Sequence, residues 1–124
     1  MNLVDSSGWL EYFSGSRRAH YFETAIENTE ELVVPVICLY EVFKVVARQR
    51  DETAAINAIS FMRHGEVITI DERVSLAASR LSLEHNLAMA DALILSVALQ
   101  ESATIWTQDI DFKGLANVQY FAKR

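Results

Sequence analysis

The sequence predicts an α/β domain in which a mostly parallel sheet carries helices on both faces. Five short apolar runs are separated by longer segments whose apolar residues recur with the helical period. Strands that alternate with helices form right-handed βαβ units, and such strands lie parallel in one sheet. The chain of 124 residues is long enough to bury a core, so residues 1–124 are expected to form a single domain.

Composition excludes several classes of protein. Hydrophobic residues make up 51% of the chain, which argues against disorder. No apolar run reaches the about 20 residues that cross a bilayer, and the N-terminus lacks the pattern of a signal peptide. Cys38 is the single cysteine, so no internal disulfide forms, and its apolar neighbours predict a buried thiol. We therefore expect a cytoplasmic protein that does not associate with membranes.

A short strand and a short helix open the chain. Residues 2–4 are apolar and form the first strand, which ends at Asp5. Ser6 and Ser7 are candidate N-caps for a helix that Gly15 ends. The Asp5 side chain has two interpretations, as a helix cap and as a ligand, and the residues alone weigh them equally.

The next two helices enclose the second strand. Residues 16–28 repeat the helical period, with a buried face formed by Ala19, Phe22, Ala25 and Ile26. Residues 32–36 are β-branched, as in a strand buried on both faces, and Pro35 ends that strand and starts a helix. This helix covers residues 37–50, with an inner stripe of Tyr40, Phe43, Val46 and Ala47. An adjacent face carries Glu41, Lys44, Val45 and Arg48.

The second half of the chain continues the alternation. Asp51 is expected to cap a helix through Met62, which Gly65 closes. Asp71 caps the next helix, and a further helix that begins near Asp91 leads into the fourth strand. The third, fourth and fifth strands are expected at residues 67–70, 103–106 and 118–121.

Acidic residues gather at one predicted edge of the sheet. Asp5 follows the first strand, Glu41 lies one turn into the helix after the second, and Asp109 follows the fourth. Asp91 stands at a helix start, and helix starts share an edge with strand ends in parallel α/β sheets. These four carboxylates are therefore expected to converge. Asp71 also follows a strand, but helix capping explains it fully.

Each acid also has a purely structural interpretation. Glu41 is compatible with an acid favoured by the helix dipole, although an unpaired carboxylate beside an inward Tyr40 would be costly. Asp91 has only small or apolar neighbours, so a partner or metal explains it better than capping does. Thr107 is placed to orient a carboxylate, and Asp111 is expected to support the site or cap a loop.

The ligand type decides which metal these acids would hold. Carboxylates without histidine or cysteine form a hard oxygen site, which suits Mg²⁺ or Mn²⁺ and not zinc. The net charge of −6 is unfavourable for a nucleic-acid enzyme, but a bound cation neutralises part of it. Lys44 and Arg48, on the helix of Glu41, are the candidates for guiding RNA, and Arg17 and Arg18 form a second basic pair.

Four short motifs now form a recognisable set. They are Asp5-Ser6-Ser7, Glu41, Asp91-Ala92-Leu93-Ile94, and Thr107-Gln108-Asp109 followed by Asp111-Phe112. The set resembles the PIN-domain nucleases, and its length and order resemble the VapC toxins of prokaryotic toxin–antitoxin modules. Each motif is weak alone, but the four acids in this order form a fairly specific signal over residues 2 to about 121.

The resemblance implies a three-layer αβα fold with a parallel five-stranded sheet in the order 3-2-1-4-5. It also implies that one or two Mg²⁺ or Mn²⁺ ions are held by Asp5, Glu41, Asp91 and Asp109. Ser7 and Thr107 would support them through hydrogen bonds. The toxins are ribonucleases that form homodimers, leave a 3′ hydroxyl and a 5′ phosphate, and are inhibited by a small VapB-like antitoxin whose tail lies across the acidic groove.

Two positions depart from the family pattern. Gln108 stands where many members carry Arg, which would weaken phosphate contact near the metal. The spacing from Asp109 to Phe112 is shorter than in many toxins, so Asp109 and Asp111 are both candidates for the fourth acid.

Two other functions stay open at this point. A receiver-type phosphoacceptor domain has this size and alternation of elements, with Asp71 as the residue that would be phosphorylated. A PIN-fold binding module without catalysis is the second alternative, although an intact set of acids argues against it.

Overall fold

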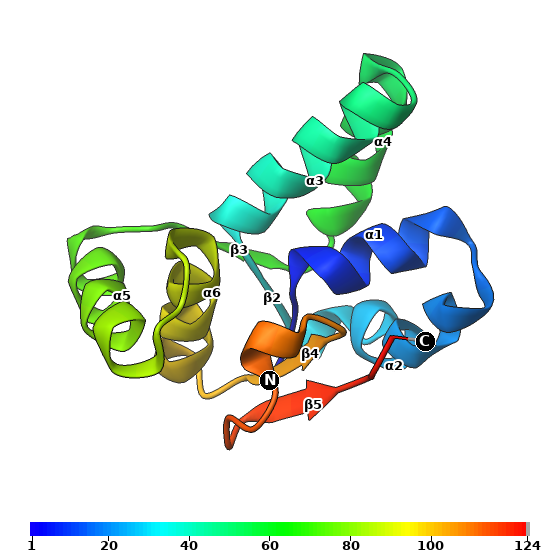
Figure 1. The fold of residues 1–124 in the computed structure, drawn as a ribbon. Coiled ribbons are helices and arrows are strands. Elements are labelled where there is room, and N and C mark those ends of the chain that lie inside the picture. The colour runs from blue at the N-terminus through cyan, green and yellow to red at the C-terminus, as the bar shows by residue number, and fades with distance from the viewer. Residues whose placement is uncertain (124) are drawn as a thin grey trace.

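A five-stranded parallel sheet in the order β3-β2-β1-β4-β5 forms the centre of the molecule (Figure 1). The computed structural model describes residues 1–123. The strands are β1 Asn2–Val4, β2 Leu32–Pro35, β3 Glu66–Ile68, β4 Thr104–Thr107 and β5 Val118–Tyr120. The predicted fold class and strand order are thereby confirmed.

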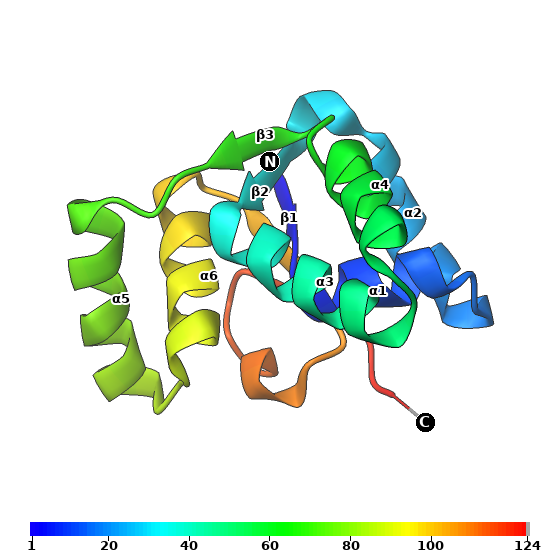
Figure 2. The same cartoon turned by 90° about the horizontal axis from the view of Figure 1, so that it is seen from above.

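Helices flank this sheet. They are α1 Ser6–Ser14, α2 His20–Glu27, α3 Val36–Gln49, α4 Glu52–Met62, α5 Glu72–His85 and α6 Met89–Gln100. The short 3₁₀ turns are η1 Arg17–Ala19, η2 Thr29–Glu31 and η3 Ile110–Phe112. Helices α3 and α4 form a pair that projects from the sheet, and α5 and α6 form a second pair (Figures 1 and 2). Within residues 1–123, every helix is too short or too polar to span a membrane.

Strand β2 is buried on both faces, as its continuous apolar run predicts, and β1 is buried at Leu3 and Val4, whereas β4 alternates half-buried Thr104 and Trp106 with buried Ile105 and Thr107. Leu3 of β1 pairs with Val33 of β2 on one side and Ile105 of β4 on the other, and all three are 0% exposed. Phe112 is also fully buried and anchors the segment after β4. The carboxyl ends of these strands are therefore held by a packed core.

The N-cap of α1 differs from the prediction. Asp5, and not Ser6 or Ser7, caps the helix, because its Oδ1 accepts a hydrogen bond from the backbone N–H of Gly8 at 3.0 Å. A serine at position 6 or 7 already has helical backbone geometry, so its hydroxyl is free for other contacts. The residue that the sequence offered as either cap or ligand thus has a capping role.

Two other predicted caps are confirmed, and one predicted helix end is wrong. Asp51 and Asp71 each accept a hydrogen bond from the backbone N–H three residues later, at 2.7 and 2.9 Å. Helix α4 ends at Met62 with Arg63 as its C-cap, so Gly65 does not close it. Instead Gly65 packs under Leu32, where an added Cβ would lie 3.0 Å from that side chain.

The buried face of α3 also differs from the prediction. Cys38 and Val42 are 0% exposed, whereas Tyr40 is 59% exposed and Phe43 is half-buried. Positions 38 and 40 lie about 200° apart around a helix, so the inner stripe is rotated from the expected one. The reason is tertiary: α3 packs against α1, α4 and α6 as well as β2. The prediction of a buried Cys38 thiol is confirmed.

Residues 16–28 form a 3₁₀ turn and a helix in place of one helix. The chain makes η1, capped by Ser16, and then α2. The predicted buried face is nevertheless correct, since Ala19, Phe22, Ala25 and Ile26 are all buried. The helical period therefore identified the buried side chains even though it missed the break.

Candidate functional site

The carboxyl edge of the sheet carries the acids that the sequence singled out. Asp5 directly follows β1, Glu41 lies in the second turn of α3 after β2, and Asp109 follows β4. Asp91 lies in the first turn of α6, which starts at this edge. Their charges act on one another, because Asp109, Asp111, Asp5 and Glu41 all raise the pKa of Asp91. The edge is thus one electrostatic unit.

Asp5 is the most enclosed of these acids, at 2% exposed. Its Oδ1 accepts hydrogen bonds from the Ser7 hydroxyl at 2.8 Å and the Gly8 backbone at 3.0 Å. Its Oδ2 accepts one from the Thr107 hydroxyl of β4 at 2.7 Å. Burial raises the pKa of Asp5 to about 6 against the opposing effect of these bonds, and the charge of Asp109 adds to the rise. One carboxylate therefore caps α1 and joins β1 to β4.

Three other carboxylates form a tight group. Asp91, Asp109 and Asp111 each present an oxygen such that these atoms all lie within 4.8 Å of one another. Burial, followed by the charges of Asp109 and Asp111, raises the pKa of Asp91 to about 7. Like charges at this separation repel unless a proton or a cation lies among them. Oxygen ligands alone form the donor set that Mg²⁺ and Mn²⁺ prefer.

The loop after β4 brings Asp109 and Asp111 together. The backbone N–H of Asp109 donates to the Thr107 hydroxyl at 2.8 Å, and Asp109 Oδ1 accepts from the backbone N–H of Asp111 at 2.9 Å. Asp109 thereby caps η3, and this turn places Asp111 beside it. From the sequence, Asp111 was expected to support the site or cap a loop and was a less favoured ligand than the other acids. Its carboxylate nevertheless lies in the tight group. The two-residue spacing between Asp109 and Asp111 does not predict that their carboxylates meet, because the geometry of the η3 turn decides it.

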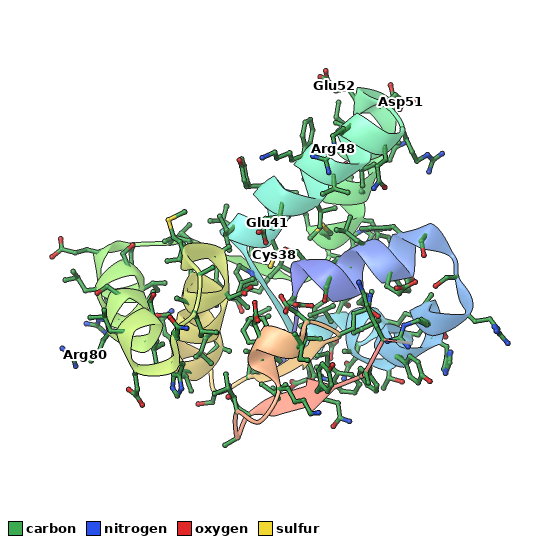
Figure 3. The ribbon with its side chains drawn as sticks, in the orientation of Figure 1. Cys38, Glu41, Arg48, Asp51, Glu52 and Arg80 are labelled. Atoms are coloured by element: carbon green, nitrogen blue, oxygen red, sulfur yellow. The ribbon has the colours of Figure 1, made fainter. Side chains whose placement is uncertain are left out.

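Glu41 stands apart from the tight group but belongs to the same edge. Its Oε1 accepts a hydrogen bond from the Ser6 hydroxyl at 2.5 Å, which fixes the side chain against the start of α1. Figure 3 shows it at the base of α3, close to Cys38. Burial, together with the charges of Asp5, Glu41 and Asp91, raises the pKa of the Cys38 thiol, so that thiol stays protonated.

The two proposed RNA-contact residues lie farther along α3. The Lys44 ammonium lies 5.7 Å from the centre of the exposed Tyr40 ring. Arg48 is exposed well beyond Glu41 toward the far end of the helix (Figure 3). The structure therefore does not place Arg48 beside the acids.

Gln108 forms a network that sequence reasoning missed. This side chain is 5% exposed; its oxygen accepts from Arg18 Nε at 2.9 Å, and its nitrogen donates to Glu11 Oε1 at 2.7 Å. Its backbone N–H also donates to the Ser7 hydroxyl at 3.3 Å. The network holds the loop that carries Asp109. Sequence reasoning missed the network because its members are far apart in the chain. Only the basic pair Arg17–Arg18 had indicated that this region could carry a role.

One protein-family model and several solved structures match this chain. A family model described as the PIN domain matches residues 3–118. No curated protein matches significantly. A toxin–antitoxin complex from Klebsiella pneumoniae is 24% identical, with a TM-score of 0.82, and covers 99% of this chain and 100% of that chain.

Two further structures share the fold. VapC20 from Mycobacterium tuberculosis, described as a toxin that cleaves the sarcin–ricin loop, is 17% identical with a TM-score of 0.79, covering 95% of this chain and 97% of that one. VapBC2 from Rickettsia felis, bound to a promoter DNA fragment, is 19% identical with a TM-score of 0.73, covering 98% and 97%.

The strand order separates these proteins from receiver domains. Receiver-type sheets have the order 2-1-3-4-5, whereas this sheet has β3 at the edge and β1 in the centre. Asp71, the phosphoacceptor candidate, caps α5 at the end of that edge strand. The family model spans nearly all of the sheet and the acids at its carboxyl edge, and the chain therefore belongs to the PIN-domain family.

Proposed function

We propose that this chain is a metal-dependent endoribonuclease toxin of the VapBC type. The observation that carries the proposal is the grouping of Asp91, Asp109 and Asp111, whose carboxylate oxygens lie within 4.8 Å in a member of the PIN-domain family. Hydrolysis of a phosphodiester requires positive charge beside the phosphate, and a cluster of acids can provide it only by holding a cation.

The residues of the edge fit a hard divalent ion. Asp5, Glu41, Asp91 and Asp109 are the proposed ligands of one or two Mg²⁺ or Mn²⁺ ions, and Asp111 joins them because of its place in the tight group. All donors are carboxylates. The raised pKa values of Asp5 and Asp91, about 6 and about 7, fit a site whose charges need a cation.

The supporting hydrogen bonds orient these carboxylates. Thr107 and Ser7 hold the two oxygens of Asp5, and Ser6 holds one oxygen of Glu41. Each hydroxyl restricts the rotation of its carboxylate before an ion binds, so less conformational entropy is lost when the ion is bound. We propose that the second oxygen of Glu41 either contacts the ion or orients the attacking water.

The chemistry itself is in-line hydrolysis of RNA. When bound, the ion supplies charge that offsets the phosphate oxygens and lowers the pKa of water. Asp5 accepts hydrogen bonds from three groups, which leaves about one of its four lone-pair sites open in a fixed direction. The carboxylate of Asp91, whose pKa is raised to about 7, has to be deprotonated before it acts as a ligand, so activity should rise with pH as its proton leaves.

Partners and location belong to the same proposal. The structures from Klebsiella pneumoniae and Rickettsia felis, and a DNA-bound VapBC from Salmonella typhimurium, are described as toxin–antitoxin or VapBC assemblies. We propose that this chain likewise acts in the cytoplasm as a homodimer inhibited by a VapB-like antitoxin. A short neighbouring gene that encodes a DNA-binding N-terminus and neutralises the toxin on co-expression would support this assignment.

Removal of Asp91 tests the catalytic proposal. The purified protein should cleave single-stranded RNA in Mn²⁺ and stop when EDTA is added. The cleavage rate of Asp91→Asn should be more than about 100-fold lower than that of the parent protein. Mn²⁺ should also no longer raise the Tm of this variant as it does for the parent. Glu72→Gln, which changes an exposed acid on α5, is the matched control. Undiminished cleavage by nuclease-free Asp91→Asn protein would overturn the assignment.

A further inference from the structure

Cationic and aromatic side chains gather where the α1–α2 connection meets the C-terminal segment. We define the cationic corner as Arg18, Tyr21 and Phe121, which contact one another, together with their sequence neighbours Arg17 and Lys123. Arg18 holds it together, because its Nη2 donates to the Phe121 carbonyl at 3.2 Å and its guanidinium carbon lies 5.3 Å from the Tyr21 ring centre. The rings of Tyr21 and Phe121 stack at 4.8 Å. Arg17, Tyr21 and Lys123 are exposed.

A groove connects this corner to the carboxylate edge. Two adjoining cavities of about 440 and 260 Å³ are both lined by Ser7, Gln108 and Lys123. The larger reaches Asp109 and has Ile110 and Tyr120 on its wall, and the smaller continues past Leu10, Glu11 and Ser14. In Figure 1 the C-terminal segment runs from β5 toward the side of the molecule where α1 ends.

The floor of the groove is fixed, and the charge of Glu11 on its wall is countered. Gln108 is clamped between Arg18 and Glu11. The Glu11 carboxylate also accepts from the Ser16 hydroxyl and lies 3.9 Å from Arg18. The charge of Glu11 is therefore balanced by groups within the wall, whereas Lys123, which lines both cavities, is exposed. A polyanion entering the groove meets a cation that is available to it.

These features suit a single nucleic-acid strand. Proteins bind single strands with cations that follow the backbone and with aromatic rings that receive bases. Here Lys123 and Arg17 supply charge. Tyr21 is 37% exposed as a residue and offers the part of its ring that is left open by Phe121, by the Arg18 guanidinium and by the His20 ring, whose centre lies 4.2 Å away. A double helix has its bases paired inside and would not use the rings. The chemistry thus selects single-stranded RNA over a duplex.

The alternative path along α3 has weaker support. Lys44 lies over the Tyr40 ring, and Arg48 is seven residues beyond Glu41, a rise of about 10 Å along the helix. Neither Lys44 nor Arg48 lines any of five cavities described within residues 1–123, including the two that adjoin Gln108.

We propose that single-stranded RNA runs from the carboxylate edge through the groove over Gln108 and onto the cationic corner. Lys123 and Arg17 contact its phosphates, and Tyr21 receives a base. This inference rests on the proposed ribonuclease function and adds the direction in which the substrate leaves the site.

Binding of a fluorescein-labelled single-stranded RNA of 12 nucleotides tests the path. The experiment uses the full chain in Ca²⁺, a larger hard cation, with fluorescence anisotropy at several salt concentrations, and KM and kcat are measured separately in Mn²⁺. Arg17→Ala/Lys123→Ala should raise Kd and KM about 10-fold, leave kcat within about 2-fold, and lower the salt slope by about 1.4. Tyr21→Ala should weaken single-strand binding and leave the salt slope unchanged.

The matched control is Arg73→Ala/Arg80→Ala. It removes the same two charges from exposed positions on α5, and Figure 3 shows Arg80 on the opposite side of the molecule from the C-terminal segment. This control should change Kd by less than about 2-fold. The comparison therefore separates a local contact from a general loss of positive charge.

Several outcomes would overturn the path. Unchanged RNA affinity in Arg17→Ala/Lys123→Ala, or a loss found only in Lys44→Ala/Arg48→Ala, would place the strand elsewhere. Normal RNA affinity with lost antitoxin binding would assign the corner to a protein partner. If the parent protein neither cleaves nor binds RNA, the proposed function itself fails, and that result is distinct from a failure of the path.

Discussion

The ends of β1 and β3 carry the same local structure, but only one contributes to the candidate site. Asp5 and Asp71 each follow a strand and accept a hydrogen bond from the backbone N–H three residues later, at 3.0 and 2.9 Å. Asp5 is 2% exposed, and its other oxygen accepts from Thr107 on the neighbouring strand. Asp71 is exposed. Strand β1 is central in the sheet, and β3 is at its edge.

This difference shows that capping is local and that site formation depends on the neighbouring strand. An aspartate before a helix can always satisfy a backbone N–H of the first turn. Only in the centre of the sheet do strand ends on both sides bring further carboxylates and hydroxyls to it. The resulting burial and the charge of Asp109 raise the pKa of Asp5 to about 6, and a carboxyl group so placed suits a cation.

Replacing Asp5 and Asp71 with asparagine should give the largest difference in activity between the two positions. Asp5→Asn and Asp71→Asn both keep a side-chain oxygen for the cap. Asp5→Asn should reduce Mn²⁺-dependent RNA cleavage by more than about 100-fold, because a negative ligand is lost. Asp71→Asn should stay within about 2-fold. Single-turnover cleavage at saturating Mn²⁺ measures both, and similar losses in the two variants would mean that the sheet centre has no special role.

Thr107→Val should have the next largest effect. Valine has nearly the same shape but cannot donate to Asp5 Oδ2 or accept from the Asp109 backbone. Cleavage should fall about 10- to 100-fold, with a loss of about 1 kcal/mol in the free energy of unfolding. Thr107→Ser should restore most of the activity. Thr104→Val, at the other end of β4, is the control, and an equal loss there would indicate a general effect on the strand.

The pH dependence of stability should show a smaller effect. The pKa values of Asp5 and Asp91 are raised from 3.8 to about 6 and about 7. Between about pH 4 and pH 7 the metal-free folded state therefore holds protons that the unfolded state has released, so stability falls as pH rises. The penalty is absent below about pH 4 and complete above about pH 7.

A comparison of Tm values checks this behaviour. Because other carboxylates also titrate, the measured quantity is the Tm of the parent protein minus that of Asp91→Asn, recorded in EDTA from pH 4 to pH 7. This difference should fall by a few degrees, and Mn²⁺ at pH 7 should reverse the fall in the parent alone. A difference that does not change with pH would contradict the raised pKa of Asp91.

Local chemistry was largely predictable from the sequence. Asp51 and Asp71 were assigned as caps from the residue type and the helix that follows, and both form those bonds. The buried apolar runs at β1 and β2 were identified because apolar continuity depends on residues close in sequence. The face of α3 was misplaced, since the exposure of Tyr40 depends on which helices pack around α3.

The sequence by itself determined which acids stand at strand ends and helix starts, and hence which edge of the sheet carries them. Only the tertiary structure decided that Asp111 joins Asp91 and Asp109, that Thr107 binds Asp5, and that Gln108 is clamped between distant side chains. The physical reason is the distance along the chain over which each interaction acts. Capping and apolar period act over a few residues, whereas these contacts depend on a turn and on pairing between strands about a hundred residues apart.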